Sequence, residues 1–285
     1  MQKISIKSYG EREVYDEALK KLCFVIAGAF HQNKRVLIFL SGGSSVNLYA
    51  KLADWIASTK DFGGNLGRSR KQHEQMLHLP RATKERNLNN MDMLFRSVSL
   101  AFAQVDERFQ PGDQVESRKY NVVSRLNKNI NSDAIGESGL WEMCKKLRIP
   151  FHLVSQKGSL NEAADEYNQT TEQLLKEYDY KIAVLGIGED GHTAGLLPGY
   201  RQKWYVPRFV AGYENNGKFN KRISLTPQGL MQLDYALIVV LGDKKKIVIQ
   251  EVLNRNNYDK VNLYPAVVLQ KIPNLDLFTD ISFGH

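Results

Sequence analysis

Four continuous apolar runs are the feature that most constrains the fold of this 285-residue chain. They lie at residues 35–40, 97–105, 181–188 and 235–242, and segments with helical spacing separate them. A strand with one solvated face alternates apolar and polar residues, whereas a strand covered on both faces is apolar throughout. The pattern therefore predicts an α/β fold in which helices cover both faces of a doubly wound, mainly parallel sheet.

Helices are expected before, between and after these strands, at residues 11–31, 44–57, 159–178 and 243–253, and a further short strand is expected at 151–155. Ser159 is followed three residues later by Glu162, which is the spacing of a capping box and predicts a helix start. Asp243 is the expected N-cap of the last of these helices.

Two stretches interrupt the alternation of strands and helices. Residues 60–96 are polar and basic without a clean period, and the irregular region 110–150 contains several glycines and prolines. Long stretches of this kind are typical of loops and insertions. We therefore expect one α/β domain over residues 1–285, with insertions at about 60–96 and 126–150.

Composition narrows the class of protein. Two cysteines cannot form a disulfide framework, and this favours a reducing compartment. The sequence contains no run of about 18 apolar residues, and its first ten residues lack the apolar core of a signal peptide. A cytoplasmic protein with no membrane partner is the expectation. The formal net charge of +8 favours an anionic partner.

The first candidate site follows the strand at 35–40, where Ser41, Gly42, Gly43 and Ser44 precede a predicted helix. Small residues let the backbone approach an anion, and the N–H groups at a helix start point toward it. We expect these residues to bind a phosphate, although a simple tight turn would have the same composition. The loop is no Walker motif, because no Gly-Lys-Ser/Thr follows.

The second candidate site is the sequence Asp106-Glu107-Arg108, directly after the strand at 97–105. Carboxylates next to a guanidinium suit the recognition of hydroxyl and phosphate groups, and they also suit a structural ion pair. Lys245 lies at the start of a predicted helix, where a positive charge would strengthen the attraction of that helix end for an anion.

The glycine-rich segment 186–194 begins in the last residues of the strand at 181–188 and matches G-x-G-x-x-G. Its acidic residues lie where the pyrophosphate of a dinucleotide would bind, and Pro198 shortens the helix that should follow, so these residues argue against NAD. The segment does place Asp190 beside His192. Histidine, with an unperturbed pKa of roughly 6.5, suits proton transfer near neutral pH.

The remaining residues argue against other kinds of site. The histidines and cysteines show no spacing typical of a metal site, so no metal and no cofactor is expected. No G-x-S-x-G motif occurs either, which argues against a serine nucleophile.

Taken together, these segments resemble the 6-phosphogluconolactonase family, within the glucosamine-6-phosphate isomerase/deaminase superfamily. The most specific match is LGIGEDGHTAGLLP at 185–198. SGGSS, VDERFQP, RISLT, LGDKK and YPA follow the family order and support the match. Residues 60–96 and 126–150 lie outside this resemblance.

The resemblance implies a Rossmann-like fold and the hydrolysis of 6-phosphoglucono-δ-lactone to 6-phosphogluconate, a step of the pentose phosphate pathway that needs no metal. His192, oriented by Asp190, would be the general base for a water molecule. Backbone N–H groups of the glycine turn, alone or together with an arginine, would stabilise the oxyanion, and Gly188 would belong to the substrate-binding residues. Arg108 and Lys245 would supply positive charge to the phosphate.

In the same resemblance Asp106 would contact sugar hydroxyls, and a small sugar phosphate is the expected partner. Leu197 stands where the deaminase branch has a glutamate, and Arg108 stands where that branch typically has an aromatic residue. Both differences favour the lactonase branch.

Two alternatives remain open: an enzyme like glucosamine-6-phosphate deaminase or isomerase, and a non-catalytic sugar-phosphate-binding protein. Nucleic acid is disfavoured as a partner, because no helix-turn-helix segment precedes the domain.

Overall fold

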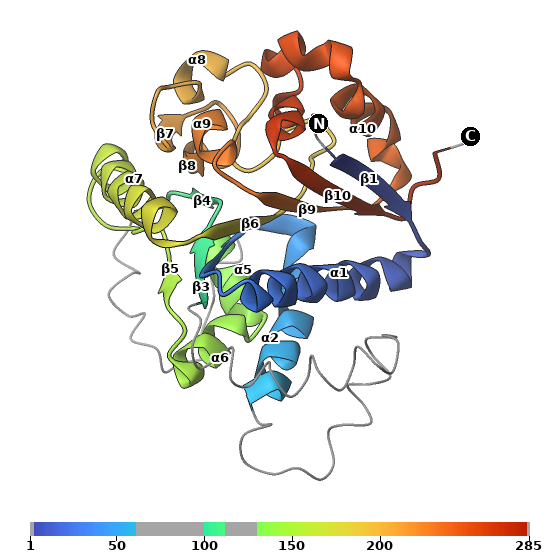
Figure 1. Cartoon of the computed structure of the whole chain (residues 1–285). Helices are drawn as coiled ribbons and strands as arrows, with labels where there is room; N and C mark the ends of the chain where they lie inside the picture. Colours follow the sequence, from blue (N-terminus) through green and yellow to red (C-terminus); the bar gives the residue numbers. More distant parts are fainter. Residues whose placement is uncertain (1–2, 61–99, 112–129, 284–285) are drawn as a thin grey trace.

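The structure of the chain is a computed structural model that describes residues 3–60, 100–111 and 130–283 (Figure 1). Almost all of the insertion expected at 60–96 lies outside these residues, as do residues 97–99 of the second expected strand and residues 126–129 of the second expected insertion.

Within the described residues, one parallel sheet of seven strands forms the centre of the molecule, in the order β1-β10-β9-β6-β2-β3-β5. All its strand pairs run parallel. The strands are β1 (Lys3–Ser8), β2 (Val36–Leu40), β3 (Leu100–Gln104), β5 (Phe151–His152), β6 (Tyr180–Leu185), β9 (Tyr235–Val240) and β10 (Asn274–Thr279).

Helices cover both faces of this sheet (Figure 1). The longer ones are α1 (Glu11–His31), α2 (Val46–Lys60), α5 (Asn131–Glu137), α6 (Leu140–Leu147), α7 (Leu160–Glu177) and α10 (Lys246–Leu253). The short ones are α8 (Arg201–Trp204), α9 (Pro227–Leu230) and the 3-10 segments η1 (Gly43–Ser45), η4 (Asp243–Lys245), η5 (Arg255–Asn262) and η6 (Pro265–Lys271).

The side chains of β2 show why its sequence is apolar throughout. Val36, Ile38 and Leu40 pack into one core with α1, α2 and α6, and the alternate residues Leu37 and Phe39 pack into a second core with α7 and α10. Successive side chains of a strand point to opposite faces, so both sets are buried only when both faces are covered. The predicted doubly wound α/β fold is confirmed.

A second, smaller sheet packs beside the first and was not predicted. It consists of β4 (Asp106–Arg108), β8 (Lys221–Leu225) and β7 (Val210–Glu214) in antiparallel order. Apolar residues of β7 and β8 belong to the same core as α7. This sheet positions residues 106–108 against residues 222–224 of β8.

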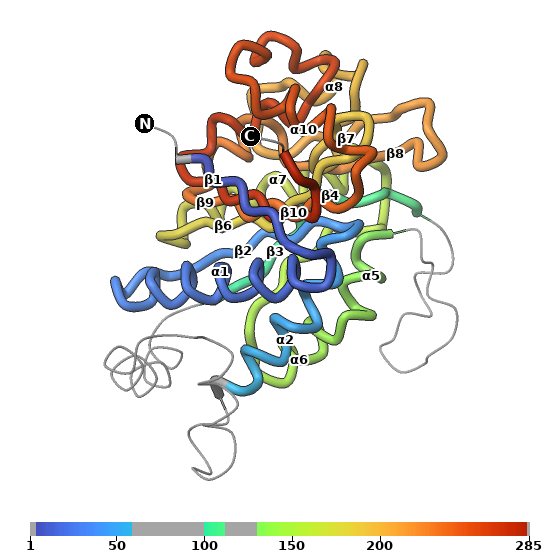
Figure 2. Tube along the Cα trace, turned by 90° about the vertical axis from the view of Figure 1, so that its right-hand side faces the viewer, coloured from blue at the N-terminus to red at the C-terminus, as the bar shows by residue number. Residues whose placement is uncertain are grey.

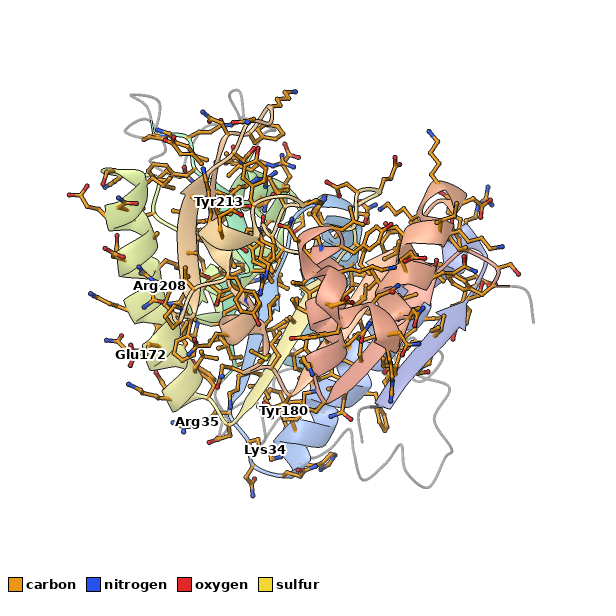
Figure 3. All side chains as sticks on the ribbon, turned by 90° about the horizontal axis from the view of Figure 1, so that it is seen from above. Lys34, Arg35, Glu172, Tyr180, Arg208 and Tyr213 are labelled. Atoms are coloured by element: carbon orange, nitrogen blue, oxygen red, sulfur yellow. The ribbon has the colours of Figure 1, made fainter. Side chains whose placement is uncertain are left out.

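Charged side chains fix the amino ends of β2 and β6 relative to each other. Arg35 donates from Nε and Nη2 to the carboxylate of Asp179, over 3.1 and 3.2 Å. These hydrogen bonds hold the pKa of Asp179 at about 2. The neighbouring Lys34 places its Nζ 5.3 Å from the ring centre of Tyr180, the first residue of β6 (Figure 3).

Two corrections concern helices. Residues 131–147 form α5 and α6 instead of an irregular segment, because Ile135, Leu140 and Cys144 are buried in the core that contains α2, while Gly139 at φ +79° separates the two helices. Asp243 is not an N-cap: it is the first residue of η4, and α10 begins at Lys246 without a side-chain cap.

A third correction concerns the strand expected at 151–155, which covers only two residues, because β5 pairs with β3 at the edge of the sheet over two positions alone. The capping box of Ser159 and Glu162 is confirmed. No helix among the described residues is both long enough and apolar enough to cross a membrane.

The central position of β2 gives a prediction about stability. Ile38 is fully buried, and Ile38→Ala should lower the free energy of unfolding by about 2–5 kcal/mol through lost burial and a cavity. Ile247→Ala is the matched control, because Ile247 is 74% exposed, and it should change that free energy by less than about 0.5 kcal/mol. Equilibrium urea unfolding measures both values, and equal effects would contradict this packing.

Candidate active site

The loops that carry the candidate residues meet where the strand order reverses. From β2 the chain proceeds to β3 and β5 on one side, and it then returns to β6 on the other side of β2. Ligands of open α/β sheets bind at such a reversal, beyond the carboxyl ends of the strands. The segments that follow β2, β3 and β6 leave the sheet at this end. Ser41 and His192 lie in the loops after β2 and β6, and Asp106 is the first residue of β4, which follows β3.

His192 and Asp190 form a hydrogen-bonded pair on the loop after β6. The imidazole Nδ1 lies 2.5 Å from Oδ1 of Asp190, and the same oxygen accepts the backbone N–H of His192 over 3.1 Å. His192 is 39% exposed at its side chain. Because Nδ1 is engaged by the carboxylate, the other ring nitrogen, Nε2, is the one that can exchange a proton with a bound molecule.

Gly188 is required by this pair. A Cβ atom at position 188 would lie 2.2 Å from Cε1 and from Nδ1 of His192 and 2.7 Å from Oδ1 of Asp190. The imidazole therefore rests directly on the Gly188 backbone, and any side chain there would displace it.

Two glycine N–H groups of this turn form hydrogen bonds within it. Gly188 donates to the carbonyl of His192 over 2.9 Å, and Gly191 donates to the carbonyl of Gly188 over 3.0 Å. These two N–H groups are therefore engaged within the turn and hold its shape.

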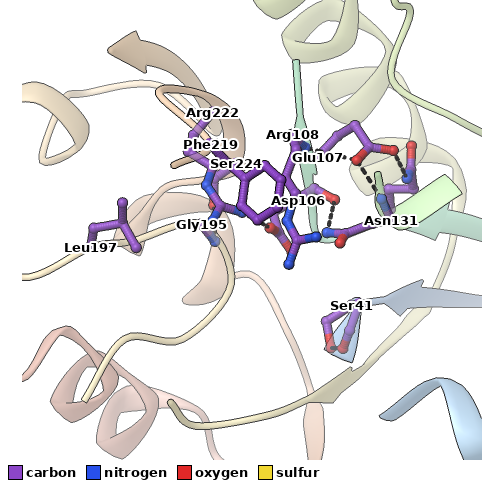
Figure 4. A network of polar contacts seen from close by, with 12 residues as sticks. Ser41, Asp106, Glu107, Arg108, Asn131, Gly195, Leu197, Phe219, Arg222 and Ser224 are labelled. Atoms are coloured by element: carbon purple, nitrogen blue, oxygen red, sulfur yellow. Dashed lines mark hydrogen bonds and ion pairs between the residues drawn. The ribbon is translucent and has the colours of Figure 1, made fainter. Parts of the chain in front are cut away.

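Asp106 lies buried between positive groups. Its Oδ2 is 3.5 Å from Nη1 of Arg222, and it also interacts electrostatically with His192 and Arg108. Burial raises the pKa of Asp106, although these three neighbours oppose the rise. Asp106, Arg108 and Arg222 lie together in Figure 4, and the electrostatic interaction of Asp106 with His192 joins them to the loop after β6.

Arg222, the first residue of the RISLT segment, was not among the predicted site residues. It is the second residue of β8 and pairs directly with Arg108 across the small sheet. Only the pairing of β4 with β8 brings these two arginines together, because they lie far apart in the sequence and share no motif. The side chain of Arg222 is 12% exposed.

Glu107, next to Asp106, has a different task. Its carboxylate accepts the N–H groups of Arg108, Asn131 and Ser132 and the amide Nε2 of Gln104, at 2.7–2.9 Å. Burial raises its pKa, and these hydrogen bonds oppose the rise. Glu107 therefore links the start of α5 to the end of β3, and both of its carboxylate oxygens accept hydrogen bonds within the protein.

Asn131 links two candidate loops and was also not predicted. Its Nδ2 donates to the carbonyl of Asp106 over 3.0 Å (Figure 4). A Cβ atom on Gly42 would lie 2.2 Å from its Oδ1, so the carboxamide covers the Gly42 backbone. Gly42 thus permits close packing of its own loop against the loop after β3.

The other residues of the loop after β2 differ in their exposure. Ser41 is buried, with its Oγ 3.2 Å from Oγ of Ser45 and its carbonyl accepting the hydroxyl of Tyr49. Gly43, at φ +70°, is exposed, and Ser44 is half-buried. The accessible part of the loop therefore centres on Gly43 and Ser44.

Lys245 lies close to the acidic residues of the loop after β6. It is the last residue of η4, and burial lowers its pKa against the opposing effects of Glu189, Asp280 and Asp190. Its ammonium group thus lies within electrostatic range of the carboxylate that orients His192.

Comparison with known proteins identifies the family. The model of the family described as glucosamine-6-phosphate isomerases/6-phosphogluconolactonase matches residues 79–275. The chain belongs to this family. The match begins after the loop that contains Ser41.

Individual members of the family are similar to the chain at different levels. It is 30% identical to the 6-phosphogluconolactonase of Borreliella burgdorferi over 184 residues, which cover 63% of this chain and 72% of that protein. It is also 29% identical to the glucosamine-6-phosphate deaminase of Staphylococcus aureus over 148 residues, which cover 48% and 55% of the two chains.

Solved structures agree on the fold. The crystal structure of 6-phosphogluconolactonase from Thermotoga maritima matches with a TM-score of 0.66 at 19% identity, over 97% of this chain and 99% of that one. The Trypanosoma brucei 6-phosphogluconolactonase matches with a TM-score of 0.62 at 18% identity, over 98% and 97%. At these identities the likeness concerns the fold alone.

The close contact between Gly188 and His192 predicts that a methyl group added at position 188 will disturb the imidazole. Gly188→Ala should displace the imidazole and break its hydrogen bond to Asp190. The downfield proton resonance of the Nδ1–H group should then disappear from the NMR spectrum. Gly28→Ala is the control, because no atom lies within 4 Å of the position that its added methyl group would take, and it should leave this resonance in place.

The hydrogen bond also predicts how Asp190 titrates. Burial alone would raise the pKa of Asp190, but the hydrogen bond and charge of His192 lower it below the ordinary value of about 3.9. The pair therefore stabilises the fold above the unfolded-state pKa, and this contribution is lost as the pH falls through the folded-state pKa. Carbon-13 NMR titration should show a higher pKa for Asp190 in His192→Ala, and an unchanged value would contradict the pairing.

Proposed function

We propose that this chain hydrolyses 6-phosphoglucono-δ-lactone to 6-phosphogluconate. Its Borreliella burgdorferi relative, a 6-phosphogluconolactonase, is named for this reaction. The observation that carries the proposal is the His192–Asp190 pair, which Asp106 links electrostatically to the cations Arg108 and Arg222 at the strand reversal. A base and positive charge at one point are what the hydrolysis of an anionic lactone requires.

The base in this proposal is Nε2 of His192. Asp190 accepts a hydrogen bond from Nδ1–H, so Nε2 carries the lone pair that removes a proton from a water molecule. The water oxygen bonds to the lactone carbonyl carbon, and the carbonyl oxygen becomes the oxyanion of a tetrahedral intermediate. The bond from that carbon to the ring oxygen then breaks, and the ring oxygen takes the proton from Nε2.

Gly188 and Gly191 already donate within the glycine turn, so we look to a side chain for the oxyanion donor. We assign this role to Arg222, which is largely buried and carries a charge only 3.5 Å from the carboxylate of Asp106. A guanidinium in such a dry setting stabilises developing negative charge more strongly than one in water.

The remaining residues would bind the substrate. The accessible N–H groups near Gly43 and Ser44, together with Arg108 and Lys245, would hold the phosphate. Asp106 would accept hydrogen bonds from sugar hydroxyls. Gly42 and Ser41 would act through the shape of the loop, since Asn131 covers one and Ser45 contacts the other.

A deaminase is the second candidate, because the Staphylococcus relative carries that name. Leu197 argues against it. This side chain packs against the core, and its backbone bonds to Tyr213 and Trp204, so no carboxylate is available at this position for ring opening. Release of ammonia from glucosamine 6-phosphate by the purified protein would favour the deaminase instead.

The function is tested by lactone hydrolysis on the purified protein, corrected for spontaneous ring opening. His192→Ala should lower kcat by about 10²–10⁴-fold, because it removes the general base. His31→Ala, an exposed histidine at the end of α1, should keep full activity. Equal turnover in both variants, or none in the unaltered protein, would refute the proposal.

The role assigned to Arg222 predicts a different kinetic effect. Arg222→Met should lower kcat by about 10²–10³-fold, as the loss of an oxyanion donor does. The affinity for 6-phosphogluconate should change much less, which isothermal titration calorimetry can measure. If the variant lost affinity but retained kcat, the role of Arg222 would be phosphate binding and not stabilisation of the oxyanion.

A further inference from the structure

The hairpin between β7 and β8 places an aromatic ring among the cations of the site. The ring centre of Phe219 lies 4.1 Å from Cζ of Arg108, 5.9 Å from Cζ of Arg222 and 5.3 Å from Nζ of Lys218. Figure 4 shows this ring beside both guanidinium groups. Phe219 is not part of the chemistry derived above, and nothing in the sequence motifs points to it.

The hairpin holds this ring in a defined place. The side chain of Asn215, which is buried, donates to the carbonyl of Phe219 over 2.9 Å and accepts the N–H of Gly217 over 2.8 Å. The backbone N–H of Asn216 donates to the hydroxyl of Tyr200 over 2.8 Å. The turn is thus held by the hydrogen bonds of its own Asn215 side chain and by the hydrogen bond to Tyr200.

An aromatic ring suits this position better than a carboxylate would. Arg108 and Arg222 are paired across β4 and β8, so their like charges repel. Burial, followed by the charge of Arg222, lowers the pKa of Arg108. A ring attracts the flat face of a guanidinium through its π electrons, and stacking does not consume the N–H donors in the guanidinium plane. A carboxylate would occupy those donors.

We propose that Phe219 is a positioning residue, which stacks on Arg108 and orients its N–H donors toward the anionic group of the substrate. The inference rests on the proposed function for the identity of that substrate. Because Phe219 acts on a binding cation and takes no part in the proton transfer by His192, it should govern affinity and leave the chemical step unchanged.

The test replaces the ring by an aliphatic side chain of similar bulk. Phe219→Leu should raise KM for the lactone and Kd for 6-phosphogluconate about three- to tenfold, with kcat within about twofold of the original value. Phe219→Trp, which keeps a π face, should restore both constants. Unchanged KM and Kd in Phe219→Leu, or no rescue by Phe219→Trp, would overturn the inference.

A control variant separates positioning from a general loss of an aromatic residue. Tyr205 stacks on Arg201 with 4.8 Å between the ring centre and Cζ, and it lies outside the proposed site. Tyr205→Leu should leave KM and Kd unchanged. If Tyr205→Leu raised KM and Kd as much as Phe219→Leu does, the result would count against the inference.

The dependence on Arg108 is measured by a double-mutant cycle. Once Arg108→Met has removed the cation, Phe219→Leu should produce no further rise in Kd. A full additive effect would show that the ring acts elsewhere.

The inference can also be judged if the proposed function fails. Absence of lactone turnover in the unaltered protein refutes the function alone. The Kd for inorganic phosphate, compared between the unaltered protein and Phe219→Leu, then still decides the role of Phe219: a rise of about threefold or more supports it, and equal values refute it.

Discussion

The parallel register of the central sheet is the constraint on which the site depends. Because every pair of strands in it runs the same way, the loops after β2, β3 and β6 all emerge at one edge. The reversal of strand order between β2 and β6 then leaves room between the outgoing loops. Residues 41, 106 and 192 lie far apart in the sequence, and the sheet brings them together.

The loops are held in place by groups that take no part in the proposed reaction. Glu107 uses its carboxylate to bind backbone N–H groups of α5 and β4, and Asn131 packs its amide on Gly42 while it bonds to the strand end at Asp106. Gly188 supports the imidazole of His192 by having no side chain. Such supporting contacts keep the reacting groups in one geometry, as catalysis by oriented groups requires.

The sequence was informative wherever one segment carried the whole signal. The apolar run of β2 reveals a strand buried on both faces, and the spacing of Asp190 and His192 on a glycine-rich turn reveals a pair that the structure joins by a hydrogen bond. Ser159 and Glu162 likewise predict their own cap.

Features that depend on contacts between distant segments were not predictable. Arg222 reaches the site only because β8 pairs with β4, and Phe219 only because a hairpin returns it to Arg108. The glycines at 136 and 139 suggest irregular structure, although burial of the apolar residues around them favours helices there. The net charge of +8 indicated an anionic partner without locating it, since the positive groups in the proposed site are Arg108, Arg222 and Lys245.

The pairing of β1 with β10 has a consequence for how the chain folds. Lys3 to Ser8 lie beside Asn274 to Thr279 in register (Figure 2). Tyr9 stacks on Phe278 with 6.1 Å between ring centres. During synthesis on the ribosome, β1 emerges long before β10, so β1 cannot pair with β10 until that strand has also been synthesised. Contacts of such long sequence separation slow folding, so this edge of the sheet should be the last to close during synthesis.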